Sequence, residues 1–227
     1  APLRTTPQVR VLIGGLGLGF TLRAALDLLR ADAEVVVAEL VAEVVAWNAD
    51  PRFGISVEAM ADPRVRVVHD DVTNVIRANP GGFDAIITNP PWEIFKPNAK
   101  EFFEAFSDLV TKKKMTIQAF EHEQADLLRD PDIRKAWLEY LSGYPHVSAF
   151  FRSADQYRNQ ISVMDGKKAG TDINLYKLFT EQCFNLLRPG GYCGIVIPSG
   201  IYTDLGTKQL REILFTQATV TGLFCIE

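Results

Sequence analysis

Four apolar runs alternate with segments of helical period in the first part of the chain, and this alternation is what most constrains the fold. VRVLI opens into a glycine cluster and then into apolar residues spaced as on one face of a helix. Glu34 to Ala38 is a continuous apolar strand of the doubly buried type, and a helix from about Val41 to Asn48 follows. PRVRVVHDDV and FDAIITN give a third and a fourth strand. Strands and helices alternating in this way predict βαβ units and a doubly wound, mostly parallel α/β sheet.

A helical insertion is expected between residues 97 and 171, where this rhythm stops. AKEFFEAFSDLV carries its apolar residues at helical spacing. Asp130 and Pro131 are typical of a helix start, and Gly143 is typical of a helix end. The stretch from Gly143 to Thr171 has no regular period, so we expect a long loop there.

Strand and helix alternate again after the insertion. We expect a helix capped by Asp172 and ended by RPGG, a fifth strand from Tyr192 to Ile197, and a helix from about Gly206 to Phe215. VTGLFCIE reads as a sixth strand. Sheets of this kind often finish with an antiparallel strand, and no candidate for one follows, so we expect a truncated chain.

Length and composition favour one domain over residues 1–227 and limit its partners. The chain has 227 residues and 47% hydrophobic content, enough to bury a sizeable core. A net charge of −4 argues against a generally basic nucleic-acid coat, so any DNA contact must be local. There is no signal peptide and no apolar run of membrane-spanning length. The cysteines and histidines show no disulfide or metal-ligand spacing, and we expect a soluble, cytoplasmic protein without a metal site.

A glycine loop at the end of the first strand marks the expected cofactor site, because ligands of open α/β sheets bind beyond the carboxyl ends of the strands. Its glycines are Gly14, Gly15, Gly17 and Gly19. Phe20 breaks the G-x-G-x-x-G spacing of a dinucleotide site, which weakens a nicotinamide interpretation without excluding it. A merely tight strand-to-helix turn is the alternative.

Acidic residues stand at the ends of the next two predicted strands. Glu39 fits an acid that accepts hydrogen bonds from two ribose hydroxyls, or alternatively one that initiates a helix. Either Asp70 or Asp71 could bind an exocyclic adenine amine. Together with the glycine loop, these features resemble the cofactor half of a class I S-adenosyl-L-methionine (SAM) methyltransferase, a Rossmann-like fold.

The sequence from about residue 8 to residue 88 resembles the spermidine synthase family more narrowly. RVLIGGLGLGFTLRAAL, VVVAELVAEVVAWN and PRVRVVHDDV carry this resemblance. It implies decarboxylated SAM as cofactor, with Glu39 on the ribose and Asp71 on the adenine. That family needs a catalytic aspartate after its fourth strand, where this chain has Thr88-Asn89-Pro90-Pro91. Aminopropyl transfer is therefore the second interpretation.

The tetrad Asn89-Pro90-Pro91-Trp92 follows the fourth predicted strand and resembles the motif of DNA adenine-N6 methyltransferases. The adenine amine is a poor nucleophile because its lone pair is delocalised into the ring. The Asn89 side-chain oxygen and the Pro90 carbonyl can accept its two hydrogens and aim that lone pair at a sulfonium methyl group. The prolines stiffen the loop, and Trp92 offers a flat face to a flipped adenine.

Residues 83–227 look like the adenine-methylating part of type IIG restriction–modification enzymes. NPPWEIFKPNAKEFF and GTDINLYKLFTEQCFNLLRPGGYCGIVIPSG carry this resemblance. It implies a SAM-dependent enzyme with DNA as substrate, a cofactor half over 1–88, a catalytic half over 89–227 with the insertion at 97–171, and a target-recognition domain that is absent here. The two resemblances meet between about Phe83 and Asn89. A chimera and natural divergence are both interpretations of this junction, and a SAM-binding domain without turnover is a further one.

Overall fold

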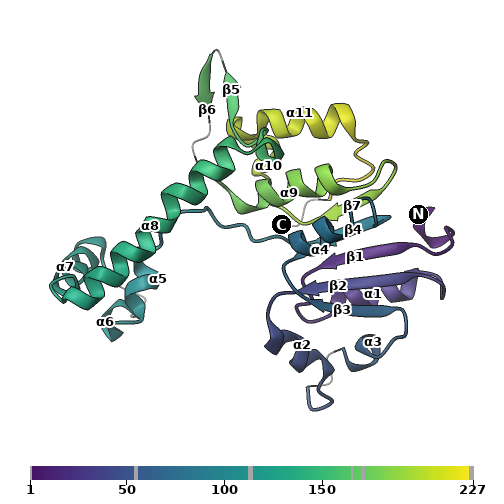
Figure 1. The fold of residues 1–227 in the computed structure, drawn as a ribbon, viewed down its shortest axis with the longest axis horizontal. Helices are drawn as coiled ribbons and strands as arrows, with labels where there is room; N and C mark the ends of the chain where they lie inside the picture. The colour runs from purple at the N-terminus through teal and green to yellow at the C-terminus, as the bar shows by residue number, and fades with distance from the viewer. Residues whose placement is uncertain (1, 54–55, 112–114, 165, 170–171, 225–227) are drawn as a thin grey trace.

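A five-stranded parallel sheet organises the chain in the computed structural model (Figure 1). The structure describes residues 2–53, 56–111, 115–164, 166–169 and 172–224. The strand order is β3-β2-β1-β4-β7, with every neighbouring pair parallel. The strands are β1 (Arg10–Gly14), β2 (Glu34–Glu39), β3 (Val65–His69), β4 (Ala85–Thr88) and β7 (Tyr192–Ile195). This confirms the predicted doubly wound α/β fold and its first five strands.

Helices cover both faces of the sheet. Val35 and Val37 point to the face covered by α1 (Phe20–Leu28), α2 (Ala42–Ala49) and α3 (Val57–Met60). Val36 and Ala38 point to the opposite face, which is covered by α4 (Val72–Ala78) and α9 (Leu175–Leu186). The continuous apolar run of β2 is explained by this double burial, and each fully buried valine contributes about 1.5–3 kcal/mol.

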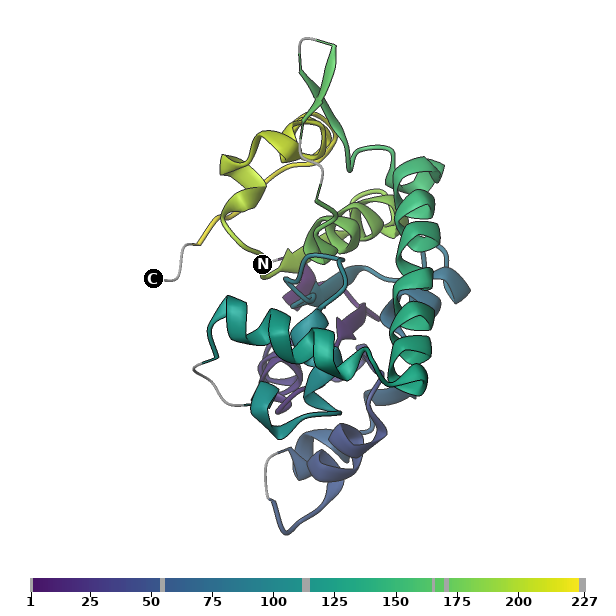
Figure 2. The same ribbon diagram turned by 90° about the vertical axis from the view of Figure 1, so that its left-hand side faces the viewer.

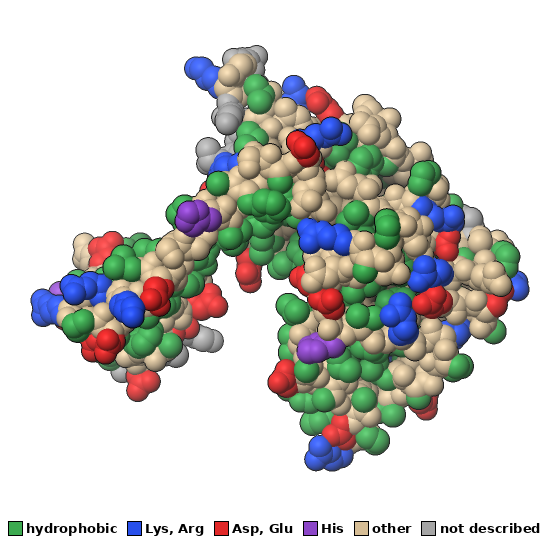
Figure 3. All heavy atoms as spheres, in the orientation of Figure 1, with side chains coloured by type: hydrophobic (Ala, Val, Ile, Leu, Met, Phe, Trp, Pro, Cys, Tyr) green, Lys and Arg blue, Asp and Glu red, His purple; other side chains and the backbone are tan. Residues whose placement is uncertain are grey.

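A helical arm extends from the sheet between β4 and α9, where the insertion was expected (Figures 1 and 2). Its helices are α5 (Ala99–Glu104), α6 (Asp108–Thr111), α7 (Ile117–Leu127) and α8 (Pro131–Ser153). The arm has its own aromatic core, in which Trp137 lies 5.0 Å from both Phe102 and Phe103 between ring centroids. Figure 3 shows an open gap between the tip of the arm and the body of the molecule.

The prediction that α8 ends near Gly143 is wrong. The helix begins as predicted, with the Asp130 carboxylate accepting hydrogen bonds from the Asp132 and Ile133 amides. It then runs through Gly143 and Pro145 to Ser153. Tertiary packing explains the continuation, because Phe95 contacts Tyr144 at 4.9 Å and Phe151 at 5.6 Å between ring centroids. The helix is kept although proline removes one of its backbone hydrogen bonds.

The expected loop before α9 contains further regular structure. η2 (Asp155–Tyr157) is followed by an antiparallel pair, β5 (Ser162–Met164) and β6 (Lys167–Ala169). The predicted Asp172 cap of α9 is also wrong, since this helix starts at Leu175. Residues 173–175 instead pair with 93–95, and the Phe95 amide donates to the Ile173 carbonyl at 2.7 Å.

The chain ends differently from the prediction after β7. α10 (Gly200–Thr203), η3 (Leu205–Thr207) and α11 (Lys208–Gln217) follow, which places the last helix two residues later than predicted. β7 itself stops at Ile195 and not at Ile197. The predicted sixth strand is not formed in residues 218–224, and residues 225–227 lie outside the described part. Phe224 is 90% exposed, which shows that this segment does not pack against the sheet. An apolar run forms a strand only where a neighbouring strand pairs with it.

None of the helices in the described part of the chain has the length and apolar character needed to cross a membrane.

Candidate active site

The loops that follow β1 and β4 begin side by side at the same edge of the sheet. Gly14, the last residue of β1, is the register partner of Thr88, the last residue of β4. The Thr88 hydroxyl donates to the Gly14 carbonyl at 3.2 Å. A Cβ atom on Gly14 would lie 2.7 Å from that hydroxyl oxygen, so only glycine lets the two strand ends approach this closely. The predicted cofactor loop and the predicted catalytic loop are therefore brought together.

The glycine loop has one open side and one filled side. Gly15 and Gly17 have φ of +91° and +51°, and a Cβ on either would meet no atom within 4 Å. Gly19 has φ of +70°, and a Cβ there would collide with the Ser56 side chain. Gly15 and Gly17 thus leave backbone exposed for the close approach of a ligand, whereas Gly19 is required by internal packing.

Glu39 lies beneath the glycine loop at the end of β2, as the sequence predicted. It is 8% exposed, and its two carboxylate oxygens accept from the Leu16 amide at 2.8 Å and from the Val41 amide at 2.9 Å. Each oxygen keeps a further lone pair that can accept from a ligand hydroxyl. Glu39 therefore connects the glycine loop to the segment that follows β2.

Two side chains that the sequence did not reveal hold the same loop. The Asn48 side-chain amide donates to the Gly17 carbonyl at 2.8 Å, and the Ser56 hydroxyl donates to the Leu18 carbonyl at 3.1 Å. Both residues are buried. They lie 31 and 38 positions from their partners, and no local pattern could have indicated contacts between positions so far apart.

The two aspartates after β3 have different surroundings. Asp71 caps α4, and its carboxylate accepts from the Thr73 amide at 2.7 Å. Asp70 is exposed, and a hydrogen bond from the Asn74 side chain, together with one from the Asp71 amide, lowers the pKa of its carboxyl group. Of the two, Asp70 is the more accessible acceptor at this edge, although the family resemblance assigned adenine binding to Asp71.

The predicted catalytic loop lies mostly at the surface. Asn89, Pro91 and Trp92 are exposed, Pro90 is buried, and an open hollow of about 580 Å³ is lined by this tetrad and Glu93. No described residue forms a hydrogen bond with the Asn89 side chain. Trp92 is 51% exposed and does not pack in the core, and its indole N–H donates to the Val196 carbonyl at 3.2 Å.

The first turn of α9 carries two buried titratable side chains, Tyr176 and Lys177. Tyr176 is buried, and burial raises the pKa of its hydroxyl to about 12, so it stays protonated. A Cβ on Gly200 would lie 3.0 Å from this hydroxyl oxygen, which places the loop after β7 against α9. Lys177 is also buried, and this burial lowers the pKa of its amine. The first residue of α10 therefore lies against α9.

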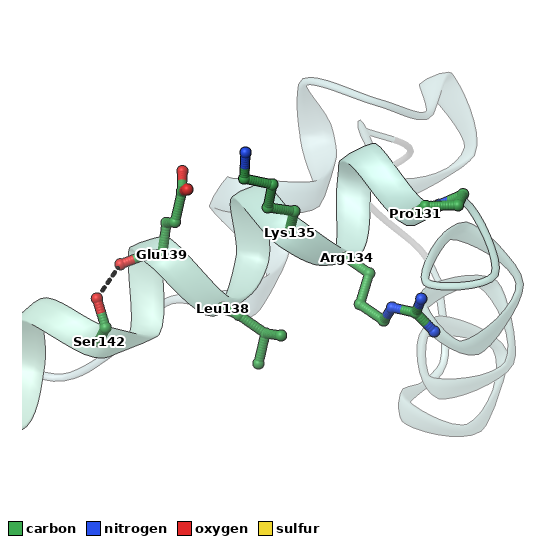
Figure 4. A pocket seen from close by; sticks show the side chains of 6 residues that line it. All are labelled: Pro131, Arg134, Lys135, Leu138, Glu139 and Ser142. Carbon is green, nitrogen blue, oxygen red and sulfur yellow. Dashed lines mark hydrogen bonds between the residues drawn. The ribbon is translucent and has the colours of Figure 1, made fainter.

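A second hollow lies on the outer surface of α8, away from the sheet edge. Figure 4 shows its six lining side chains along one helix face: Pro131, Arg134, Lys135, Leu138, Glu139 and Ser142. The Ser142 hydroxyl donates to the Glu139 carbonyl at 2.7 Å. All six residues are exposed, so this hollow lacks the buried polar groups typical of a catalytic site.

The sheet order and the glycine loop at the end of β1 define the class of the fold. It is a doubly wound, Rossmann-like α/β fold, in which ligands bind beyond the carboxyl edge of the sheet. Within that class, residues 148–225, about a third of the chain, match the model of the Eco57I restriction-modification methylase family. No curated protein matches the sequence significantly.

Three of the solved structures that resemble this chain match only part of it. Spermidine synthase from Thermotoga maritima is 27% identical, with a TM-score of 0.32, over 38% of this chain and 30% of that one. Human methyltransferase-like protein 13 in complex with SAH is 22% identical, with a TM-score of 0.31, over 40% of each chain. TrmN from Thermus thermophilus is 26% identical, with a TM-score of 0.29, over 38% of this chain and 24% of that one. The matching region thus spans well under half of each relative.

The residues at the edge fit SAM on their own chemistry. The exposed backbone at Gly15 and Gly17 permits the close approach of a ligand, and Glu39 and Asp70 offer carboxylates at the ends of the next two strands. Carboxylates in these positions suit ribose hydroxyls and an exocyclic amine.

Proposed function

We propose that this chain is the catalytic region of a SAM-dependent methyltransferase that modifies the exocyclic N6 amine of adenine in DNA, as part of a restriction–modification system. The observation that carries the proposal is the contact between Gly14 and Thr88, which sets the glycine loop beside Asn89. The match of residues 148–225 to a restriction-modification methylase family supports the same function.

The cofactor half is assigned to residues 1–88. Gly14, Gly15, Gly17 and Gly19 shape the loop, Glu39 holds the ribose, and Asp70 or Asp71 accepts from the adenine amine of the cofactor. Bound SAM supplies an electrophilic methyl group on a sulfonium. Because Glu39 is fixed by two backbone amides, its orientation is set before the cofactor binds.

The catalytic half is assigned to residues 89–227. The Asn89 side-chain oxygen and the Pro90 carbonyl accept the two hydrogens of the target amine, which directs the nitrogen lone pair toward the methyl donor. The Asn89 amide is available for this because no described residue uses it. No strongly basic side chain is needed to activate the amine.

Trp92 stacks on the flipped base. Flipping costs a few kcal/mol, and stacking of a base on an aromatic ring returns about 1–3 kcal/mol. The hydrogen bond from the indole N–H to the Val196 carbonyl holds the ring at the rim of the hollow while half of its surface stays accessible. Pro90 and Pro91 fix the backbone between the two acceptor groups and this ring.

The chain's charge predicts weak DNA binding by this region alone. The net charge is −4, and none of the described residues that line the Asn89 hollow is a lysine or an arginine. DNA affinity depends largely on basic contacts to phosphates, so we propose that a target-recognition region elsewhere in the parent protein supplies most of it. A cytoplasmic location remains a prediction.

A transfer assay with methyl-labelled SAM tests this function. Unmethylated duplex DNA should acquire label with the unaltered chain and not with Asn89→Ala. DNA labelling that survives Asn89→Ala would remove the role assigned to that side chain. A parallel reaction with decarboxylated SAM and putrescine tests aminopropyl transfer, and product formed only there would establish the second interpretation.

A further inference from the structure

We propose that Asn48 is a positioning residue that presets the glycine loop for the cofactor, with Ser56 assisting. This inference rests on the proposed function, because it concerns the same cofactor site. Neither residue belongs to the glycine motif or to the acidic strand ends.

Three side chains grip three consecutive residues of the loop. Glu39 accepts from the Leu16 amide, Asn48 donates to the Gly17 carbonyl, and Ser56 donates to the Leu18 carbonyl. The three side chains come from the end of β2, from α2 and from the residue before α3. These three hydrogen bonds fix the backbone conformation of residues 16–18. They leave the space beside Gly15 and Gly17 open.

Asn48 is buried, and a buried side-chain amide destabilises the fold unless its polar atoms form hydrogen bonds. The side chain is 1% exposed, and its oxygen has no hydrogen-bond partner among the described residues. An unpaired buried acceptor is unfavourable. Both donor hydrogens of the amide are used, one on the Val44 carbonyl and one on Gly17, each at 2.8 Å. The contact to Gly17 is the one that reaches the loop.

The hydrogen bond from Asn48 to the Gly17 carbonyl matters because three glycines of this loop have a left-handed backbone. Gly15, Gly17 and Gly19 all have positive φ. Glycine adopts positive and negative φ about equally well, so the residue type alone does not fix this conformation. Without external contacts such a loop samples many conformations. Fixing the Gly17 carbonyl selects the one that exposes the backbone at Gly15 and Gly17, which lowers the conformational entropy lost on binding.

Asn79 provides a matched control. Its side-chain amide donates to the Val75 carbonyl at 2.8 Å, four residues earlier, just as Asn48 donates to Val44 four residues earlier. In the described part of the chain Asn79 makes no hydrogen bond to the glycine loop, and it ends α4 near the opposite edge of the sheet. Replacing either asparagine removes a local helix contact, but only replacing Asn48 removes the grip on Gly17.

The test measures SAM affinity by calorimetry with Asn48→Ala, Asn48→Asp, Ser56→Ala and Asn79→Ala in the full chain, beside their melting temperatures. We expect Asn48→Ala to raise the Kd about tenfold and Asn79→Ala to change it less than about twofold. Asn48→Asp keeps the shape without the donors and should match Asn48→Ala. Ser56→Ala should raise the Kd about threefold. It removes a second hydrogen bond to the same loop, so it tests the proposal even if the Asn48 variants misfold.

Wild-type affinity in Asn48→Asp, or equal weakening by Asn79→Ala, would overturn the positioning role. Amide hydrogen exchange of residues 15–19 without ligand gives an independent readout, with faster exchange expected in Asn48→Ala and not in Asn79→Ala. Unchanged exchange in Asn48→Ala would also overturn it. If the unaltered chain fails to bind SAM while exchange responds as expected, the proposed function fails and the role of Asn48 in setting the loop stands.

Discussion

The glycine loop and the Asn89 loop leave adjacent strands of one sheet, yet they are held in opposite ways. The glycine loop has flexible residues that are fixed from outside by Glu39, Asn48 and Ser56. The Asn89 loop is stiffened internally by two prolines, and its amide is left without a partner among the described residues. Under the proposed function the difference fits two tasks: one loop offers exposed backbone to the cofactor, and the other offers unpaired acceptors to the reacting amine.

The comparison predicts its largest effect at Asn89. Asn89→Ala should lower methyl transfer by at least about 100-fold, because it removes an acceptor used mainly in the transition state. SAM affinity and the melting temperature should stay near those of the unaltered chain, since the side chain is exposed and bonded to no described residue. A comparable loss of SAM affinity would mean that the two loops do not divide the work in this way.

Gly15 tests the cofactor side. Gly15→Val should weaken SAM binding by about tenfold or more, because a side chain would fill the open surface and φ of +91° costs a non-glycine residue about 1–2 kcal/mol. Gly143→Ala is the control, since that glycine lies inside α8 with open space around it. We expect this control to stabilise the chain by about 0.5–1 kcal/mol in denaturant unfolding, without changing SAM affinity. Equal SAM binding by Gly15→Val would place the cofactor elsewhere.

Two substitutions of Trp92 distinguish the proposed base stacking from the hydrogen bond that holds the ring in place. Trp92→Ala should reduce methyl transfer about tenfold through loss of base stacking. Trp92→Phe keeps an aromatic face but loses the hydrogen bond to Val196, and should retain most of the activity. Steady-state kinetics on one DNA substrate checks both variants, and an equal loss in both would make the anchor more important than the face.

Asp70 should give the smallest effect, one that depends on pH. Its folded-state pKa is lowered by Asn74 and by the Asp71 amide, so the charged form is favoured above the ordinary carboxyl pKa and is lost only as pH falls through the lowered value. SAM affinity measured from about pH 8 to about pH 5 should therefore show no titration from this group. Asp70→Asn should reduce affinity by a constant small factor over that range, and a factor that changes near pH 5 would contradict this.

The sheet could be predicted from the sequence because its strands are buried on both faces. Val35 to Val37 form an uninterrupted apolar run that has few other structural explanations. The Asp130 cap was also readable, since its partners are the amides two and three residues later. Asn89 and the glycines were recognisable because their loops depend on special residue types at fixed spacing.

The remaining features depend on contacts between distant residues. α8 continues past Gly143 because Phe95 packs on Tyr144 and Phe151. α9 begins at Leu175 because residues 173–175 pair with residues 93–95, which follow the Asn89 loop. Asn48 and Ser56 reach the glycine loop only through the fold. These tertiary contacts override local preference, and a single sequence carries no signal for them.

A crystal structure of the chain with S-adenosylhomocysteine tests most directly whether the two loops form one site. The account predicts that the ribose binds at Glu39, that backbone contacts form at Gly15 and Gly17, and that the homocysteine sulfur faces Asn89. A ligand bound with its sulfur directed away from Asn89, or bound at another edge of the sheet, would contradict it.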